Sequence, residues 1–113
     1  KERFPEIEVL AVGANSTATG AMLRAGADQA ATGENAVLVA SRRADVIMGP
    51  IGIVIADAML GEITPVMAAA AGQSEAKRIL LPVGQCDNII AGVRDMPMAK
   101  MVQEAVELLA GWV

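Results

Sequence analysis

Three short apolar runs, each ending at or next to a glycine or a proline, constrain the fold of this chain more than any other feature. They span residues 6–13, 45–50 and 77–83 and are rich in valine, isoleucine and leucine. Runs this short and apolar are typical of strands that are buried on both faces. Strands of that kind pair in parallel, and the intervals between these runs are long enough for crossover helices.

Two helices are expected between the first and the second run. Residues 15–17 are Asn-Ser-Thr, all good N-caps, and they precede a predicted helix over 18–25. Thr32 is placed to cap a second helix over 34–43. Residues 27–31 form a short connection between the two helices that can include a brief strand.

The rest of the chain predicts three more helices and one short strand. An apolar stretch over 53–60 is expected to be helical. Thr64 followed by Pro65 indicates a helix start, because proline at the first helical position loses no backbone hydrogen bond. Residues 89–93 suit a short strand. Pro97 opens an amphipathic helix whose apolar residues recur at steps of three and four: Met98, Met101, Val102, Ala105, Leu108 and Leu109.

This order of elements predicts an α/β fold, an open, doubly wound parallel sheet of about four strands in a three-layer, Rossmann-like architecture. The 113 residues are enough for one domain, 1–113. Residues 1–5 look like the last turn of a helix, so we expect an N-terminal strand–turn–helix segment to be missing. A sheet without that strand has an unpaired edge, covered either by the lost segment or by a partner.

Residue types that are absent from the 113 residues exclude several chemistries. The sequence has no histidine, no tyrosine and a single cysteine, Cys86. A Ser-His-Asp triad, a Tyr–Lys pair, a His-rich metal site and a Cys-x-x-Cys pair are therefore excluded, and no metal is expected. A lone cysteine fits a reducing cytoplasm. The net charge is −4 without a basic cluster, so neither nucleic acid nor a membrane is expected as a partner.

Ligands of open parallel sheets bind beyond the carboxyl ends of the strands, so the loops at those ends form the candidate site. The first such loop leads to a helix N-terminus, whose free N–H groups can hold a phosphate; alternatively, its residues only cap the helix. The turn over 49–52 lets either a ligand or a helix approach the backbone closely. The candidate ligand-binding residues are Gly13, Asn15, Ser16, Thr17, Gly49, Pro50, Gly52 and Asn88.

Single polar residues leave alternatives open, and no catalytic residue is assigned. Asp57, in the apolar stretch 53–60, is either a buried carboxylate that could act as a base or an exposed charge. Cys86 is either a reactive thiol, which would need a nearby Lys or Arg, or a structural residue. Glu34 and Glu62 are interpreted as solvated or helix-dipole charges.

Several segments of the sequence resemble one protein family. They are VGANS at 12–16, AML at 21–23, AGADQ at 25–29, TGENA at 32–36, ADVIMGPIGIV at 44–54 and LGEITP at 60–65. Together they resemble a family of small bacterial proteins known as domain of unknown function 3842, over nearly the whole chain. The resemblance implies a Rossmann-like fold that starts with a strand and a glycine-rich, dinucleotide-binding type of turn, which are absent here. It implies no reaction.

Two functions from different classes remain open, and whether the chain is an enzyme stays undecided. The first is binding of a small molecule, a nucleotide or a phosphorylated metabolite, at the carboxyl ends of the strands; a nucleotide is then the cofactor class to consider. The second is a non-enzymatic, homo-oligomeric scaffold or regulatory module. The apolar fraction of 54% and the C-terminal helix that ends at Trp112 favour this second function, with a homodimer as the expected state.

Overall fold

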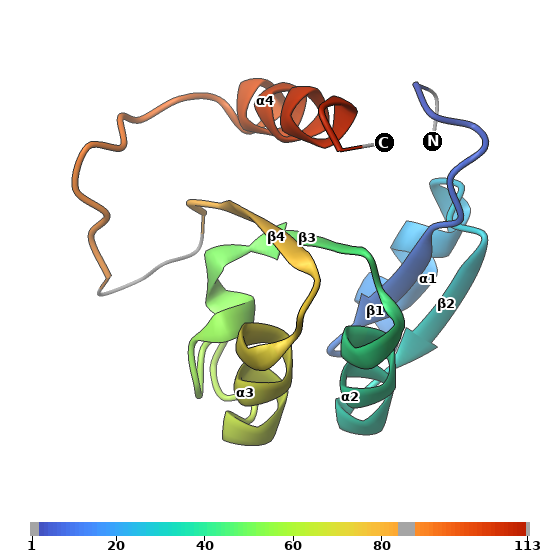
Figure 1. The fold of residues 1–113 in the computed structure, drawn as a ribbon. Coiled ribbons are helices and arrows are strands. Elements are labelled where there is room, and N and C mark those ends of the chain that lie inside the picture. The colour runs from blue at the N-terminus through green and yellow to red at the C-terminus, as the bar shows by residue number, and fades with distance from the viewer. Residues whose placement is uncertain (1–2, 84–87, 113) are drawn as a thin grey trace.

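The computed structural model describes residues 3–83 and 88–112, and it has the predicted α/β architecture with parallel strands (Figure 1). In chain order the elements are β1 (Leu10–Gly13), α1 (Ser16–Arg24), β2 (Gln29–Thr32), α2 (Glu34–Arg43), β3 (Val46–Pro50), the 3₁₀ turn η1 (Ile51–Val54), α3 (Pro65–Gln73), β4 (Lys77–Leu81) and α4 (Met98–Ala110). The three apolar runs supply β1, β3 and β4. The brief strand suggested over 27–31 is β2.

The four strands form two parallel pairs in the described part of the chain, where a single sheet was expected. β1 pairs with β2 from Leu10 beside Gln29 to Gly13 beside Thr32. β3 pairs with β4 in the same parallel sense over Val46–Pro50. Of the three apolar runs, all expected to form parallel strands, those over 45–50 and 77–83 pair with each other, whereas the run over 6–13 pairs with β2.

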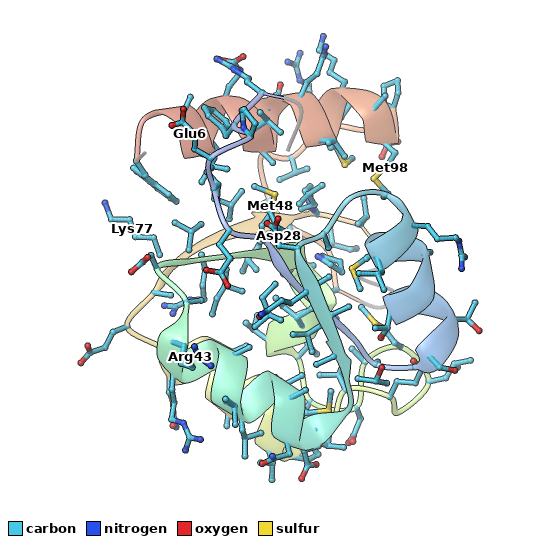
Figure 2. The ribbon with its side chains drawn as sticks, turned by 90° about the vertical axis from the view of Figure 1, so that its right-hand side faces the viewer. Glu6, Asp28, Arg43, Met48, Lys77 and Met98 are labelled. Atoms are coloured by element: carbon cyan, nitrogen blue, oxygen red, sulfur yellow. The ribbon has the colours of Figure 1, made fainter. Side chains whose placement is uncertain are left out.

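Helices cover both faces of these strands. α1 and α2 lie on opposite sides of β1 and β2 (Figure 2). α3 packs against α2 in the same layer, and α4 lies on the other side of β4 (Figure 1). Parallel strands with helices on both faces are the doubly wound arrangement that the order of elements predicts.

The core of the described residues is small and centres on α3. Ile63, Met67 and Ala68 form a buried cluster. Partly buried apolar residues pack against it: Ala14, Val37 and Ala58. No large side chain among the described residues is fully buried, and α1 buries none of its residues. The layer built by α2 and α3 therefore carries most of the packing.

Capping residues explain where α1 and α3 begin. Asn15 Oδ1 accepts the Ala18 N–H at 2.9 Å, and Thr64 Oγ1 accepts the Met67 N–H at 3.1 Å with Pro65 in the first turn. Both caps are among the predicted ones, and α1 begins two residues before the predicted residue 18. The prediction that Thr32 caps α2 is wrong, because Thr32 ends β2 and Gly33, at φ 101°, takes the cap position.

The helix predicted over 53–60 does not form. A 3₁₀ turn ends at Val54, and the backbone then passes through the left-handed region at Asp57, Met59 and Leu60, with φ of 66°, 58° and 56°. The stretch begins with three β-branched residues and has no polar face, so it lacks both the propensity and the amphipathic pattern of a surface helix.

Two further differences concern strand lengths. Residues 89–93 form no strand; Ile89 is exposed, and the Val93 N–H donates to the Ile90 carbonyl at 3.3 Å in a turn. An apolar run without a strand edge beside it has no ladder to join. β1 starts at Leu10, later than the predicted residue 6.

None of the helices in residues 3–83 and 88–112 combines the length and apolarity that crossing a bilayer requires.

Candidate functional site

Side-chain hydrogen bonds join the loops that follow β1 and η1. The Asn15 amide Nδ2 donates to the Glu62 carboxylate, with Nδ2 to Oε2 at 3.0 Å. Asn15 stands between β1 and α1, whereas Glu62 lies in the segment that leads from η1 to α3. The bond therefore connects the carboxyl end of one strand pair with the segment that follows the other.

The N-termini of α2 and α3 are tied together in the same way. Thr64 Oγ1, at the N-cap of α3, donates to Oε2 of Glu34, the first residue of α2, at 2.6 Å. On the other side, Thr32 Oγ1 at the end of β2 donates to Thr19 Oγ1 in α1 at 2.8 Å. The starts of all three helices thus gather near the carboxyl ends of β1 and β2.

The predicted glycines serve close packing between elements. A Cβ on Gly13 would lie 2.2 Å from Thr19 Oγ1 and 2.7 Å from the Thr19 backbone nitrogen. A Cβ on Gly49 would lie 3.2 Å from Ile53 Cδ1, and one on buried Gly52 would lie 3.4 Å from Ala58 Cβ. The glycines were expected to let either a ligand or another segment of the chain approach the backbone. The described contacts correspond to the second alternative, close packing between segments of the chain. Pro50 ends β3 and leads directly into η1.

The exposed first turn of α1 has hydrogen-bond donors that the Asn15 cap does not use. Asn15 accepts the N–H of Ala18, but the N–H groups of Ser16 and Thr17 point beyond the helix end, as the first N–H groups of any helix do. The positive end of the helix dipole adds to their attraction for anions. Because both residues also carry hydroxyl groups, this turn offers up to four donors.

Charged groups lie at both ends of the strands, and the amino ends carry acidic residues such as Asp28 and Asp45 beside the basic ones. The carboxylates of Glu34 and Glu62 lie at the carboxyl end, beside the helix starts. Basic residues lie at the other end: Arg24 in the last turn of α1, Arg42 and Arg43 in the last turn of α2, and Lys77 at the start of β4 (Arg43 is labelled in Figure 2). The candidate site therefore combines backbone donors with carboxylate acceptors.

Other predicted positions lie away from this site. The segment 88–97, which begins with the exposed Asn88, runs on the opposite side of the molecule from α1 (Figure 1). The segment that Asn88 begins is thus not brought to α1, and Cys86 lies outside the described residues. Asp57 is exposed in the loop before α3, which corresponds to its interpretation as an exposed charge and not as a buried carboxylate. In the described ranges, no three carboxylate or cysteine side chains cluster as metal ligands.

Glu34, Glu62 and Thr64 complete the site, and sequence reasoning gave none of them a binding role. The sequence indicates solvated or helix-dipole charges for the two glutamates and only a cap for Thr64. Their adjacency to helix starts is visible in the sequence. Their bonding partners are not, since each partner comes from a different loop.

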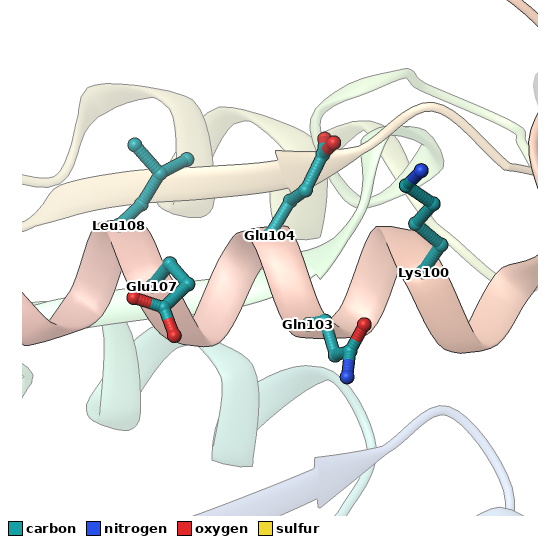
Figure 3. A pocket seen from close by; sticks show the side chains of 5 residues that line it. All are labelled: Lys100, Gln103, Glu104, Glu107 and Leu108. Atoms are coloured by element: carbon teal, nitrogen blue, oxygen red, sulfur yellow. The ribbon is translucent and has the colours of Figure 1, made fainter.

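Two surface hollows lie elsewhere. One, of about 620 Å³, is lined by Lys100, Gln103, Glu104, Glu107 and Leu108 (Figure 3). All five residues come from α4, so the hollow is one face of a helix without an opposing wall among the described residues. The other, of about 660 Å³, includes Arg42, Arg43 and Ser74, at the amino ends of the strands. Neither hollow includes a predicted site residue.

Comparison with curated proteins finds no match, and neither does comparison with solved structures. A family model, described as Domain of unknown function (DUF3842), matches residues 1–113. The match includes the loops that carry Asn15 and Glu62. Because it spans the whole chain, the chain belongs to the DUF3842 family.

Proposed function

We propose that the chain binds a nucleotide or another small phosphorylated metabolite at the carboxyl ends of its strands, between β1 and β3. The observation that carries this proposal is the Asn15–Glu62 hydrogen bond, which brings together the loops that follow the two strand pairs. Ligand sites of open α/β folds occupy this kind of position.

The order of the strands supports this location of the ligand site. α1 connects β1 to β2 on one face, and α2 connects β2 to β3 on the other face. Because parallel crossovers are right-handed, β2 and β3 must lie on opposite sides of β1. The direction of winding therefore reverses between β1 and β3, and the crevice at such a reversal is where doubly wound folds bind ligands.

The groups at this edge favour a ligand that carries both a phosphate and hydroxyl groups. A phosphate fits the N–H and hydroxyl groups of Ser16 and Thr17 at the start of α1. The carboxylates of Glu34 and Glu62 accept hydrogen bonds from hydroxyl groups such as those of a ribose. Since the basic residues of α1, α2 and β4 lie at the opposite end, inorganic phosphate alone finds no cationic partner from these elements.

A thermal-shift experiment tests the proposal with AMP, ATP, NAD and glucose 6-phosphate at millimolar concentration. A ligand present at about 100 times its Kd stabilises the folded state by about 2.7 kcal/mol, which is a shift of several degrees. Ser16→Glu is the decisive variant. A carboxylate in the first turn suits the helix dipole and keeps α1 folded, but it repels a phosphate.

Gln103→Glu on α4 is the matched control, because it adds the same charge on an exposed helix face far from the site. We expect the shift to survive in Gln103→Glu and to disappear in Ser16→Glu. Absence of a shift with all four compounds contradicts the proposal, and so does a shift of equal size in Ser16→Glu.

A homodimer formed through α4 is the second candidate. It is supported by the exposed apolar side chains of this helix: Met98, Val102 and Leu108. Trp112, expected as an interface anchor, is 41% exposed, and the Lys77 ammonium lies 4.9 Å from its ring centre within the same chain. Size-exclusion chromatography with light scattering tests this candidate. We expect a dimer for the wild type and for Gln103→Glu and a monomer for Val102→Glu; a monomeric wild type contradicts it.

A further inference from the structure

The surface hollow of about 660 Å³ lies between the C-terminal ends of α2 and α3. The two helices are packed side by side (Figure 1), and the hydroxyl of Ser74, the residue that follows α3, donates to the Ser41 carbonyl in α2 at 2.6 Å. Both helices begin at the other end, at Glu34 and Pro65. The hollow is therefore separate from the site proposed at the carboxyl ends of the strands.

Small and aliphatic residues form the covered part of the lining. Ser41 and Ala76 are buried, and Leu38, Ala44 and Ala70 are partly buried. Ligand sites are commonly lined in this way, by apolar side chains with a few polar groups among them. The inner surface of the hollow thus suits an aliphatic group of a ligand.

The Ser41 hydroxyl has no hydrogen-bond partner among the described residues. Ser41 is only 7% exposed, and its backbone carbonyl, not its Oγ, is the atom that Ser74 binds. In the same residues, no fully covered side-chain oxygen or nitrogen lacks a partner, so this hydroxyl reaches the surface. The surface that Ser41 lines is the hollow. Because nearly buried polar groups are normally hydrogen-bonded, the partner of this hydroxyl must come from the hollow.

Charged side chains of both signs form the exposed rim of the hollow. Arg42 and Arg43 belong to the last turn of α2. Asp45 stands just before β3, and Glu75 stands between α3 and β4. Across residues 3–83 and 88–112, no ion pair involves any of these four side chains. The rim therefore offers two positive and two negative charges that are not already paired.

The helix ends make the two sides of the hollow unequal. Arg78 Nη1 donates to the Ser74 carbonyl at 2.6 Å and to the Ala76 carbonyl at 3.3 Å, so a guanidinium already covers the end of α3. The C-terminal end of α2 is the negative end of its helix dipole, and such an end attracts cations. A cationic group of a ligand is thus favoured beside α2.

A ligand with charge of one sign does not match this rim. A purely anionic ligand would face Asp45, Glu75 and the negative end of α2, and a purely cationic ligand would face the two arginines. A ligand with both charges close together satisfies both sets. An α-amino acid is such a molecule, since one carbon separates its carboxylate from its ammonium. Guanidinium groups bind carboxylates with two parallel hydrogen bonds, and an ammonium has three donors for carboxylates and carbonyls.

We propose that the hollow between the ends of α2 and α3 binds a free amino acid with an aliphatic side chain. The carboxylate of the amino acid binds the guanidinium groups of the rim and accepts a hydrogen bond from Ser41. Its ammonium binds Asp45 and Glu75, and its side chain lies against Leu38 and Ala70.

A titration of the ¹⁵N-labelled full chain with L-leucine, followed by NMR, tests this proposal. At millimolar concentration, leucine should shift the amide resonances of Ser41 and Ala76. Leucinamide lacks the carboxylate and N-acetylleucine lacks the ammonium. Each should therefore bind at least about tenfold more weakly than leucine, because it loses charged hydrogen bonds.

Three variants assign the binding to the residues of the hollow. Arg43→Gln should weaken leucine binding about tenfold or more, and Ser41→Ala should weaken it about threefold to tenfold. Ser41→Ala keeps the carbonyl that Ser74 binds, and alanine favours a helix, so the fold is retained. Arg24→Gln is the matched control, because it removes the same charge from the last turn of α1, outside the hollow. Leucine binding should be unchanged in Arg24→Gln.

The proposal is overturned if leucine leaves the amides of Ser41 and Ala76 unmoved, or if it shifts only those at the start of α1. Equal affinity for leucine, leucinamide and N-acetylleucine also overturns it, because the two charges are then not recognised. The same conclusion follows if Arg43→Gln and Arg24→Gln bind leucine equally well.

Discussion

α1 and α3 are matched helices that differ in burial. Each has nine residues and begins at a side-chain cap, but α1 has two alanines and α3 has four. α3 buries Met67, Ala68 and Ala71, whereas α1 buries no residue. Their neighbours differ, because α3 is packed against α2 and η1, whereas the main neighbours of α1 in the described residues are β1 and β2. The difference in burial thus follows both from what lies beside each helix and from composition, since α1 is the more polar of the two.

The largest effect is expected from Gly13→Ala, which tests how α1 is held to β1. The new Cβ would meet backbone atoms, the Thr19 nitrogen at 2.7 Å and the Asn15 oxygen at 2.9 Å, so side-chain rotation cannot relieve the clash. We expect a loss of about 3 kcal/mol or more in the free energy of unfolding, measured by urea denaturation. Gly72→Ala in α3 is the control, since nothing lies near its Cβ and alanine favours the helix by about 0.5–1 kcal/mol.

Truncation of one apolar side chain in each helix measures the difference in burial directly. Met67, in α3, is 3% exposed, and Leu23, in α1, is 50% exposed. Met67→Ala should cost about 2–5 kcal/mol, whereas Leu23→Ala should cost about 0.5 kcal/mol. Chemical denaturation of both variants provides the comparison. Equal losses would show that α1 is covered in solution.

Loss of the caps should affect the two helices alike, because capping is a local interaction. Asn15→Ala and Thr64→Ala should each cost about 1 kcal/mol in the free energy of unfolding. Thr64→Ser keeps the oxygen that accepts the Met67 N–H and should restore most of the loss. A cap effect several-fold larger in α3 than in α1 would mean that the Thr64–Glu34 bond, not the cap, dominates there.

The smallest effect is expected for the ion pair that links the N-terminal segment to α4. Arg3 and Glu107 are 48% and 67% exposed, so solvent screens their attraction. Arg3→Ala should lower the free energy of unfolding by less than about 1 kcal/mol. The effect should decrease further with added salt. A larger, salt-independent loss would indicate that the Arg3 side chain packs in a way that charge does not explain.

The helix starts beside the candidate site were predictable because their signals are local. Asn15 and Thr64 stand directly before helices, and cap preferences act within three residues. The bonds of Asn15 with Glu62 and of Thr64 with Glu34 span 47 and 30 positions, and no pattern near either residue indicates them. For the same reason, the roles of Gly13 and Gly49 in packing needed the positions of Thr19 and Ile53.

The sequence by itself determined the α/β class, the parallel strands and the starts of α1 and α3, because hydrophobic periodicity and capping act over a few neighbouring residues. Tertiary structure alone decided that the strands separate into two pairs, that residues 53–60 form a strained loop, and that Glu62 meets Asn15. Those outcomes depend on which distant segments come to lie side by side. An apolar run has the same local pattern whether its neighbouring strand is present or absent.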